Sequence, residues 1–178
     1  MFFNHRNHLY NFCLYDFKQN RNIVKKKIDF LIYYRKYSTK ENTFIINLVN
    51  KLLKKNLTIK VVGHYMNIVK FKNNINLGFL NRKSLFDKLK QSKYTILSGE
   101  NLFSFFALDA LKENVVIFHN KKNIFSVYKK NLKQNFISLD YNNLNKSYKR
   151  VCSELKKKKS YKAKTKFLKL NNFNKYFY

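Results

Sequence analysis

The sequence has no proline and no tryptophan, and its 178 residues include only three glycines and two cysteines. Phosphate-binding loops that depend on several closely spaced glycines are therefore excluded. Cys13 and Cys152 are too few for a disulfide framework, and neither lies near a second thiol or a histidine at metal-ligand spacing, which excludes a structural zinc site. Lys, Asn or Gln interrupts every apolar stretch before the roughly 18 residues that a membrane-spanning helix needs, so we expect no membrane span.

Acidic residues are also scarce. Nine Asp and Glu face 38 Lys and Arg, which gives a formal net charge of +29 and a pI near 10.1. A protein this basic attracts polyanions, so nucleic acid or an anionic surface is the expected partner. No Ser/His/Asp, Cys/His or paired-carboxylate arrangement indicates a catalytic centre, and we expect no cofactor.

Lys and Asn are abundant, and there are 13 Tyr and 18 Phe, whereas Gly and Pro are depleted. AT-rich codons favour the first group and disfavour the second, so part of the positive charge reflects mutational drift. Such a bias is typical of an organellar or a reduced endosymbiont genome. We therefore expect a protein that is encoded and located in the mitochondrion, with the cytoplasm of an AT-rich bacterium or endosymbiont as the alternative.

The chain is long enough for one hydrophobic core, and 45% of its residues are hydrophobic. Short apolar runs alternate with stretches of helical periodicity, which predicts a single α/β domain: a Rossmann-like, three-layer fold with a parallel sheet covered on both faces. The predicted strands are 28–34, 58–62, 75–79, 94–97, 115–118 and 136–139, and the predicted helices are 42–55, 82–91, 102–111 and 123–131. The predicted core of the central strands consists of Leu31, Ile32, Val61, Val62, Ile96, Leu97, Val116 and Ile117.

Composition divides the chain into three parts, namely an N-terminal extension at 1–26, the α/β domain at 27–140, and a basic helix and tail at 141–178. The last part has 12 Lys or Arg and only Glu154 as an acid. Leu144, Tyr148, Val151 and Leu155 form one apolar stripe, which predicts a helix over 141–159. Cations that neutralise phosphates, together with aromatic rings that stack on bases, are typical of an RNA-binding extension. The predicted RNA-binding residues are Lys149, Arg150, Lys156, Lys157, Lys158, Lys159, Lys162, Lys164, Lys166 and Lys169.

Two segments resemble a known family. The sequence FLIYYRKYSTK, followed by a helix and TIKVVG, and the sequence NINLGFLNRKSLFDKLKQSKYTILSGENLFSFFALDALKENVVIF resemble the C-terminal, nucleotide-sugar-binding half of GT-B glycosyltransferases. The resemblance lies in the order of strands, helices and an acidic loop, and it covers about residues 27–125. It implies a Rossmann-like fold and a remnant of a nucleotide-sugar site.

The resemblance also implies candidate site residues. Arg35 and Lys40 fall where that family has a basic pair that grips the donor diphosphate. Asp109 falls at the second of two family acids, where it would accept hydrogen bonds from ribose hydroxyls. The position of the first acid falls on Asn101, and Glu100 is displaced by one residue.

Two functions from different classes follow. GT-B enzymes work in a cleft between two domains, and only about 26 residues precede the first predicted strand, so we expect one wall of that cleft to be missing. The first hypothesis is a non-catalytic RNA-binding component of a mitochondrial ribosome on a glycosyltransferase-like fold, with ribosomal RNA and neighbouring ribosomal proteins as partners. The alternative is a glycosyltransferase, or its nucleotide-sugar-binding half, that uses a nucleotide-sugar donor.

Overall fold

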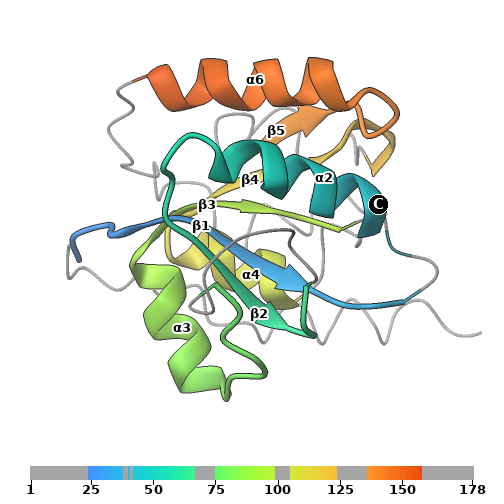
Figure 1. Cartoon of the computed structure of the whole chain (residues 1–178). Coiled ribbons are helices and arrows are strands. Elements are labelled where there is room, and N and C mark those ends of the chain that lie inside the picture. Colours follow the sequence, from blue (N-terminus) through green and yellow to red (C-terminus); the bar gives the residue numbers. More distant parts are fainter. Residues whose placement is uncertain are drawn as a thin grey trace, which may run out of the picture.

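Five parallel strands form a central sheet in the order β2-β1-β3-β4-β5 (Figure 1). The computed structural model describes residues 24–37, 40, 42–66, 75–98, 105–123 and 136–157. The strands are β1 (Ile28–Tyr34), β2 (Ile59–Gly63), β3 (Ser92–Ile96), β4 (Val116–Asn120) and β5 (Phe136–Leu139). The predicted α/β fold with a parallel sheet is confirmed.

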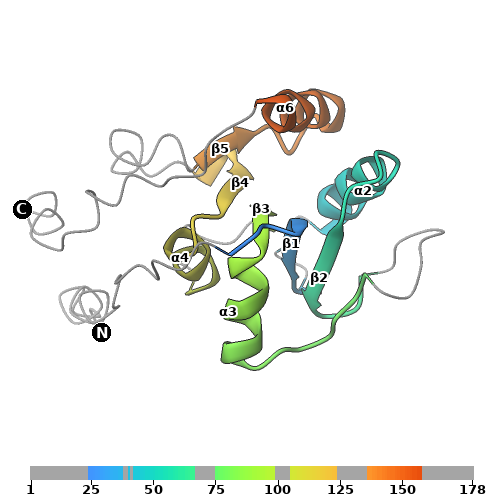
Figure 2. The ribbon, with the colours of Figure 1, turned by 90° about the vertical axis from the view of Figure 1, so that its left-hand side faces the viewer.

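Helices cover both faces of this sheet. They are α2 (Asn42–Leu53), α3 (Arg82–Lys90), α4 (Phe105–Lys112) and α6 (Leu144–Lys156), and a short 3-10 turn, η1 (Lys121–Asn123), follows β4. The helices α2 and α6 lie side by side on one face, and α3 and α4 lie on the other (Figure 2). The predicted three-layer arrangement is therefore present.

Alternation along the strands divides the core into two layers. In β1, Phe30 and Ile32 pack beneath α2 and α6, whereas Leu31 packs toward α4. All eight predicted core residues are buried, because successive side chains of a parallel strand enter apolar layers on opposite faces. The rings of Phe30, Tyr94 and Phe118 contact one another across three neighbouring strands.

The predicted strand at 75–79 is reduced to one parallel bridge between Val61 and Asn76, on the outer side of β2. The amide of Val61 donates to the Ile75 carbonyl over 2.8 Å, and the Val61 carbonyl accepts from the Leu77 amide over 2.8 Å. Gly78 then takes a φ of +68°, which ends the extended conformation. When this segment is counted as a strand, the spatial order of the strands is that of a Rossmann fold, in which the third strand along the chain lies outside the second.

The helix predicted over 141–159 is shorter at its start. Tyr141 and Asn142 form a turn, and the side chain of Asn143 accepts a hydrogen bond from the amide of Lys146 and caps α6. The predicted apolar stripe packs inward beside α2, with Val151 fully buried. The predicted helix at 123–131 falls mostly on residues outside those described. Among the described helices, none is long and apolar enough to cross a membrane.

Candidate functional site

The carboxyl end of β1 lies where the strand order changes direction, with β2 on one side of β1 and β3 on the other. Open α/β sheets bind ligands at such switch points. Arg35 follows β1 directly, and its guanidinium lies 4.9 Å from the centre of the Tyr33 ring and donates to the Tyr33 hydroxyl over 3.2 Å. Lys40 lies on the same segment, half-buried, and its amide donates to the Tyr37 carbonyl. The structure thus places both members of the predicted basic pair after β1.

Asp109 lies on α4, on the side that faces α3. Its side chain is only 5% exposed, and its Oδ1 lies 3.7 Å from a terminal nitrogen of Arg82. That Oδ1 is buried without a hydrogen bond, and burial raises the pKa of Asp109 to about 7. Asp109 is thus a buried carboxyl group between two helices, and its contact with ribose remains a prediction.

The other residues predicted around the nucleotide, Glu100 and Asn101, lie outside the described residues. The same holds for most of the predicted RNA-binding tail, namely Lys158, Lys159, Lys162, Lys164, Lys166 and Lys169. The described predicted RNA-binding residues, Lys149, Arg150, Lys156 and Lys157, are exposed on or directly after α6. These four belong to a larger cationic surface.

That surface extends over both helices of one layer. We call it the α2–α6 surface, and it consists of Lys51, Lys54, Lys55, Lys146, Lys149, Arg150, Lys156 and Lys157. The three lysines of α2 and its C-terminal turn were not among the predicted RNA-binding residues. Their spacing on the polar side of a predicted amphipathic helix indicates an exposed basic face. Only the packing of α2 beside α6 brings these three lysines next to the cations of α6.

Within the α2–α6 surface, an aromatic ring and a side-chain amide of α6 contact lysines of α2 and its C-terminal turn. The ammonium groups of Lys51 and Lys55 lie 5.5 Å and 6.0 Å from the centre of the Tyr148 ring. Lys51 also donates to the side-chain oxygen of Asn145 over 2.7 Å. A cation over an aromatic face keeps its charge while its aliphatic stem packs, so these lysines are ordered beside α6 without being neutralised.

The single acid of these two helices is buried and pairs with two cations of the α2–α6 surface. The carboxylate of Glu154 is only 2% exposed, and it pairs with Lys157 at 2.7 Å and with Arg150 at 3.4 Å. Its charge therefore offsets part of the positive charge of that surface. The α2–α6 surface presents positive charge to solvent with no exposed carboxylate on either helix.

The other acids of the described residues are either paired with lysines or buried. Asp29 pairs with Lys93 at 2.7 Å, and Asp87 with Lys90 at 3.5 Å. Glu113 is buried, which raises the pKa of its carboxyl group, and the Lys26 ammonium donates to its backbone carbonyl over 2.8 Å. The remaining positive charge meets little competition from carboxylates of the described chain.

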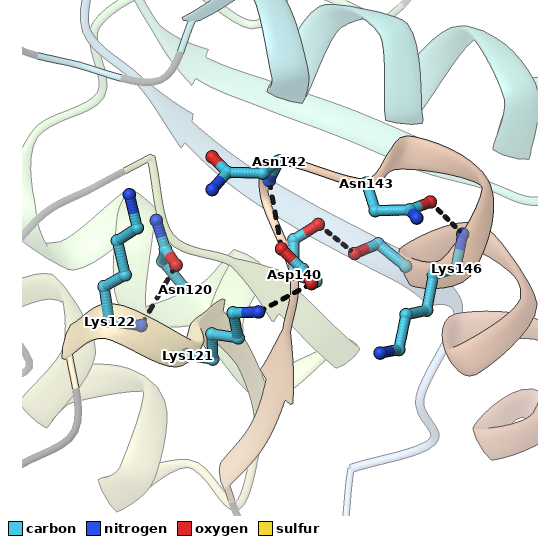
Figure 3. Close-up of polar contacts among 8 residues, drawn as sticks. Asn120, Lys121, Lys122, Asp140, Asn142, Asn143 and Lys146 are labelled. Carbon is cyan, nitrogen blue, oxygen red and sulfur yellow. Dashed lines mark hydrogen bonds and ion pairs between the residues drawn. The ribbon is translucent and has the colours of Figure 1, made fainter.

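The start of α6 is anchored through Asp140, at the carboxyl end of β5 (Figure 3). Its carboxylate accepts from the Lys121 ammonium over 2.6 Å and from the Asn142 amide over 3.2 Å, and Lys121 holds the pKa of this carboxyl group below its usual range. Its backbone carbonyl accepts from the Ser147 hydroxyl over 2.7 Å. Figure 3 shows these contacts beside the cap that Asn143 gives to α6, so the turn that precedes the helix is fixed at several points.

Within the described ranges no three His, Cys, Asp or Glu gather at the distances that a metal ion needs. His119 is buried in β4, with one ring nitrogen 2.9 Å from the Asn120 carbonyl and the other 3.2 Å from the Ser138 hydroxyl. Burial lowers the pKa of His119, because desolvation disfavours the charged imidazolium. These contacts are those of a structural histidine.

Comparison with known proteins gives a likeness in fold. No protein-family model and no curated protein matches the sequence. Among solved structures, a UDP-forming α,α-trehalose-phosphate synthase from Burkholderia xenovorans is similar, with a TM-score of 0.50 and 9% sequence identity. The likeness covers 73% of this chain and 37% of that enzyme, so the chain spans little more than a third of the enzyme's length. This similarity supports the predicted glycosyltransferase-like domain as a fold.

Proposed function

We propose that this chain is a non-catalytic RNA-binding component of a ribonucleoprotein, built on a glycosyltransferase-like domain. The α2–α6 surface is the observation that carries the proposal. It brings eight cations together on two adjacent helices, and the one acid of those helices is buried and paired. The mitochondrial ribosome is the assembly that the composition favours, with ribosomal RNA and neighbouring ribosomal proteins as partners.

The proposed contact is to the phosphate backbone. Helices that pack side by side have axes about 8–10 Å apart, so two rows of flexible lysines line one broad surface. Each lysine that approaches a phosphate releases condensed counterions, which favours binding without reading the base sequence. The predicted RNA-binding lysines after Lys157 would extend this contact along the RNA backbone.

Sedimentation of the native protein from its own cells tests the ribonucleoprotein assignment. We expect the chain to sediment with a large particle and to be released when the extract is treated with ribonuclease. A small particle of unchanged size with and without ribonuclease would contradict the assignment.

A second candidate function is nucleotide-sugar binding. The position of Arg35 and Lys40 after β1, at the switch point of a glycosyltransferase-like sheet, favours it. Titration calorimetry with UDP and with UDP-glucose tests this function, with Arg35→Ala as the variant that should weaken binding of the diphosphate. Sugar transfer that is lost in Asp109→Ala would establish an enzyme and overturn the non-catalytic proposal.

A further inference from the structure

Exposed aromatic rings gather at the carboxyl end of the sheet. Among the described residues, the large hydrophobic side chains with high exposure are Val24, Tyr37, Tyr65 and Phe79. Three of these four are aromatic, with exposed fractions of 53% for Tyr37, 73% for Tyr65 and 68% for Phe79. All three lie on segments that leave β1, β2 or the bridge beside β2. Isolated exposed rings are ordinary, but rings from three separate segments at one edge form a surface.

The imidazole of His64 joins two of these rings. It lies edge-on to Phe79, with ring centres 5.0 Å apart and planes at 76°. It also lies edge-on to Tyr37, with ring centres 5.8 Å apart and planes at 74°. We call Tyr37, His64 and Phe79 the aromatic platform; Tyr65 directly follows His64 in the sequence.

A tight approach at Gly63 and two hydrogen bonds fix the backbone beneath the platform. Gly63 has a φ of +100°, and a Cβ at this position would lie 2.4 Å from the carbonyl oxygen of Tyr34. The Gly63 amide donates to the Gly78 carbonyl over 2.8 Å, and the His64 amide donates to the Tyr34 carbonyl over 2.9 Å. Two of the three glycines in the chain thus lie at this corner, both with positive φ. The rings are therefore presented by a fixed turn, which reduces the entropy lost when they bind a ligand.

Positive charge flanks the platform. Arg35 and Lys36 are exposed on the segment that carries Tyr37, and Arg82 and Lys83 begin α3 shortly after Phe79. The described stretches 35–37, 64–66 and 75–81 contain no acid. Aromatic rings beside cations favour a flat π-system attached to phosphate, because stacking and phosphate neutralisation then act together.

We propose that the aromatic platform stacks an unpaired nucleobase of RNA. This inference rests on the proposed RNA-binding function and adds to it: the α2–α6 surface binds phosphates of any strand, whereas the platform binds a base that is free to leave a helix. Stacking on an aromatic ring tolerates every base, so the platform selects single-stranded RNA over duplex and not one sequence over another.

Binding of fluorescein-labelled RNA to the full chain tests the proposal, with a single-stranded dodecamer, the same strand with abasic sites, and a duplex of equal length. Phe79→Ala and Tyr37→Ala should each weaken single-strand binding about 5-fold or more while duplex binding changes less than about 2-fold. The conservative Phe79→Tyr should retain affinity, and Val24→Ala, which removes an exposed side chain outside the platform, is the matched control. Circular dichroism of each variant confirms that the fold is kept.

The outcomes separate this inference from the function on which it rests. Unchanged single-strand affinity in both alanine variants would overturn the platform while RNA binding by the chain stands. Failure of the wild-type chain to bind any of the RNAs would overturn both. Weakened binding of free UDP in Phe79→Ala, with unchanged binding of the dodecamer, would show that the base comes from a free nucleotide and would overturn RNA as the occupant. Equal affinity of the abasic strand and the normal strand would also contradict stacking.

Discussion

The buried carboxyl group of Asp109 should make the stability of this fold depend on pH. Burial raises the pKa of Asp109 to about 7 in the folded chain, against a reference value of 3.8. Between these values the folded protein holds a proton that the unfolded chain releases, so stability is lost as pH rises and reaches its minimum above pH 7. Arg82 compensates little, because its side chain is 68% exposed and 3.7 Å from the carboxylate.

Replacing Asp109 with Asn keeps the shape and removes the titration. Each pH unit over which only the folded chain keeps this proton lowers the stability by about 1.36 kcal/mol, so the interval from pH 5 to pH 7 contributes roughly 2 to 3 kcal/mol. The free energies of unfolding of Asp109→Asn and of the wild type, measured in urea, should therefore be compared at pH 5 and pH 8. The value for Asp109→Asn minus the value for the wild type should rise by about 2 to 3 kcal/mol between these pH values. The comparison between the two proteins cancels the titration of groups such as His119.

Ser84→Ala, which changes an uncharged side chain on α3, is the control and should show a constant difference from the wild type over the same range. A difference between Asp109→Asn and the wild type that stays constant from pH 5 to pH 8, or falls, would refute the burial of the Asp109 carboxyl group.

Three further predictions concern the sheet, the turn and the tail. Val61→Ala opens a cavity at a fully buried position of β2 and should lower the free energy of unfolding by about 1–3 kcal/mol in urea titrations, whereas an effect below about 0.5 kcal/mol would contradict the burial of this side chain. Gly63→Ala places a Cβ against the Tyr34 carbonyl at positive φ and should cost more than about 1 kcal/mol by the same measurement; a neutral result would mean that the turn is not held as described. Deleting residues 158–178, which contain seven lysines, should flatten the salt dependence of RNA binding and leave the urea midpoint unchanged; equal salt dependence in both chains would show that the tail does not contact phosphate.

The strands were predictable where charged or polar residues flank a short apolar run at both ends. The predicted bounds of 28–34 and 136–139 agree with β1 and β5, because Lys27 and Arg35 flank the first run and Asp140 ends the second. The start of α6 was misplaced, although Asn143 supplies a capping side chain three residues before Lys146. The segment at 75–79 has strand-like composition, but it pairs with one neighbour only, and the positive φ of Gly78 ends it after a single bridge.

The candidate site was harder to predict from the sequence than the strands, because the site depends on which helices and strands are neighbours in space. Lys51 and Tyr148 are 97 positions apart, and only the packing of α2 beside α6 brings the ammonium group over the ring. In the same way, His64 joins Tyr37 to Phe79 only because the bridge beside β2 brings Gly78 back to Gly63. The burial of Asp109 follows from the position of α3 against α4, which helical periodicity does not give.

The proposed role of the α2–α6 surface can be measured directly by the salt dependence of RNA binding. One variant replaces three exposed lysines of this surface with Ala, namely Lys54, Lys55 and Lys149, and a control variant replaces three exposed lysines outside both this surface and the aromatic platform, namely Lys25, Lys27 and Lys122. Both lose the same charge, so a difference between them reports position and not net charge.

The measurement is the slope of log affinity against log salt for a duplex RNA, obtained by fluorescence anisotropy. If the three lysines of the α2–α6 surface each neutralise a phosphate, the slope should become shallower by about 2 to 3 in that variant, with weaker binding at low salt, while the control variant stays within about 1 of the wild type. Equal slopes in the two variants would contradict the account, because the positive charge would then act only through its total and no surface of the fold would be its binding site.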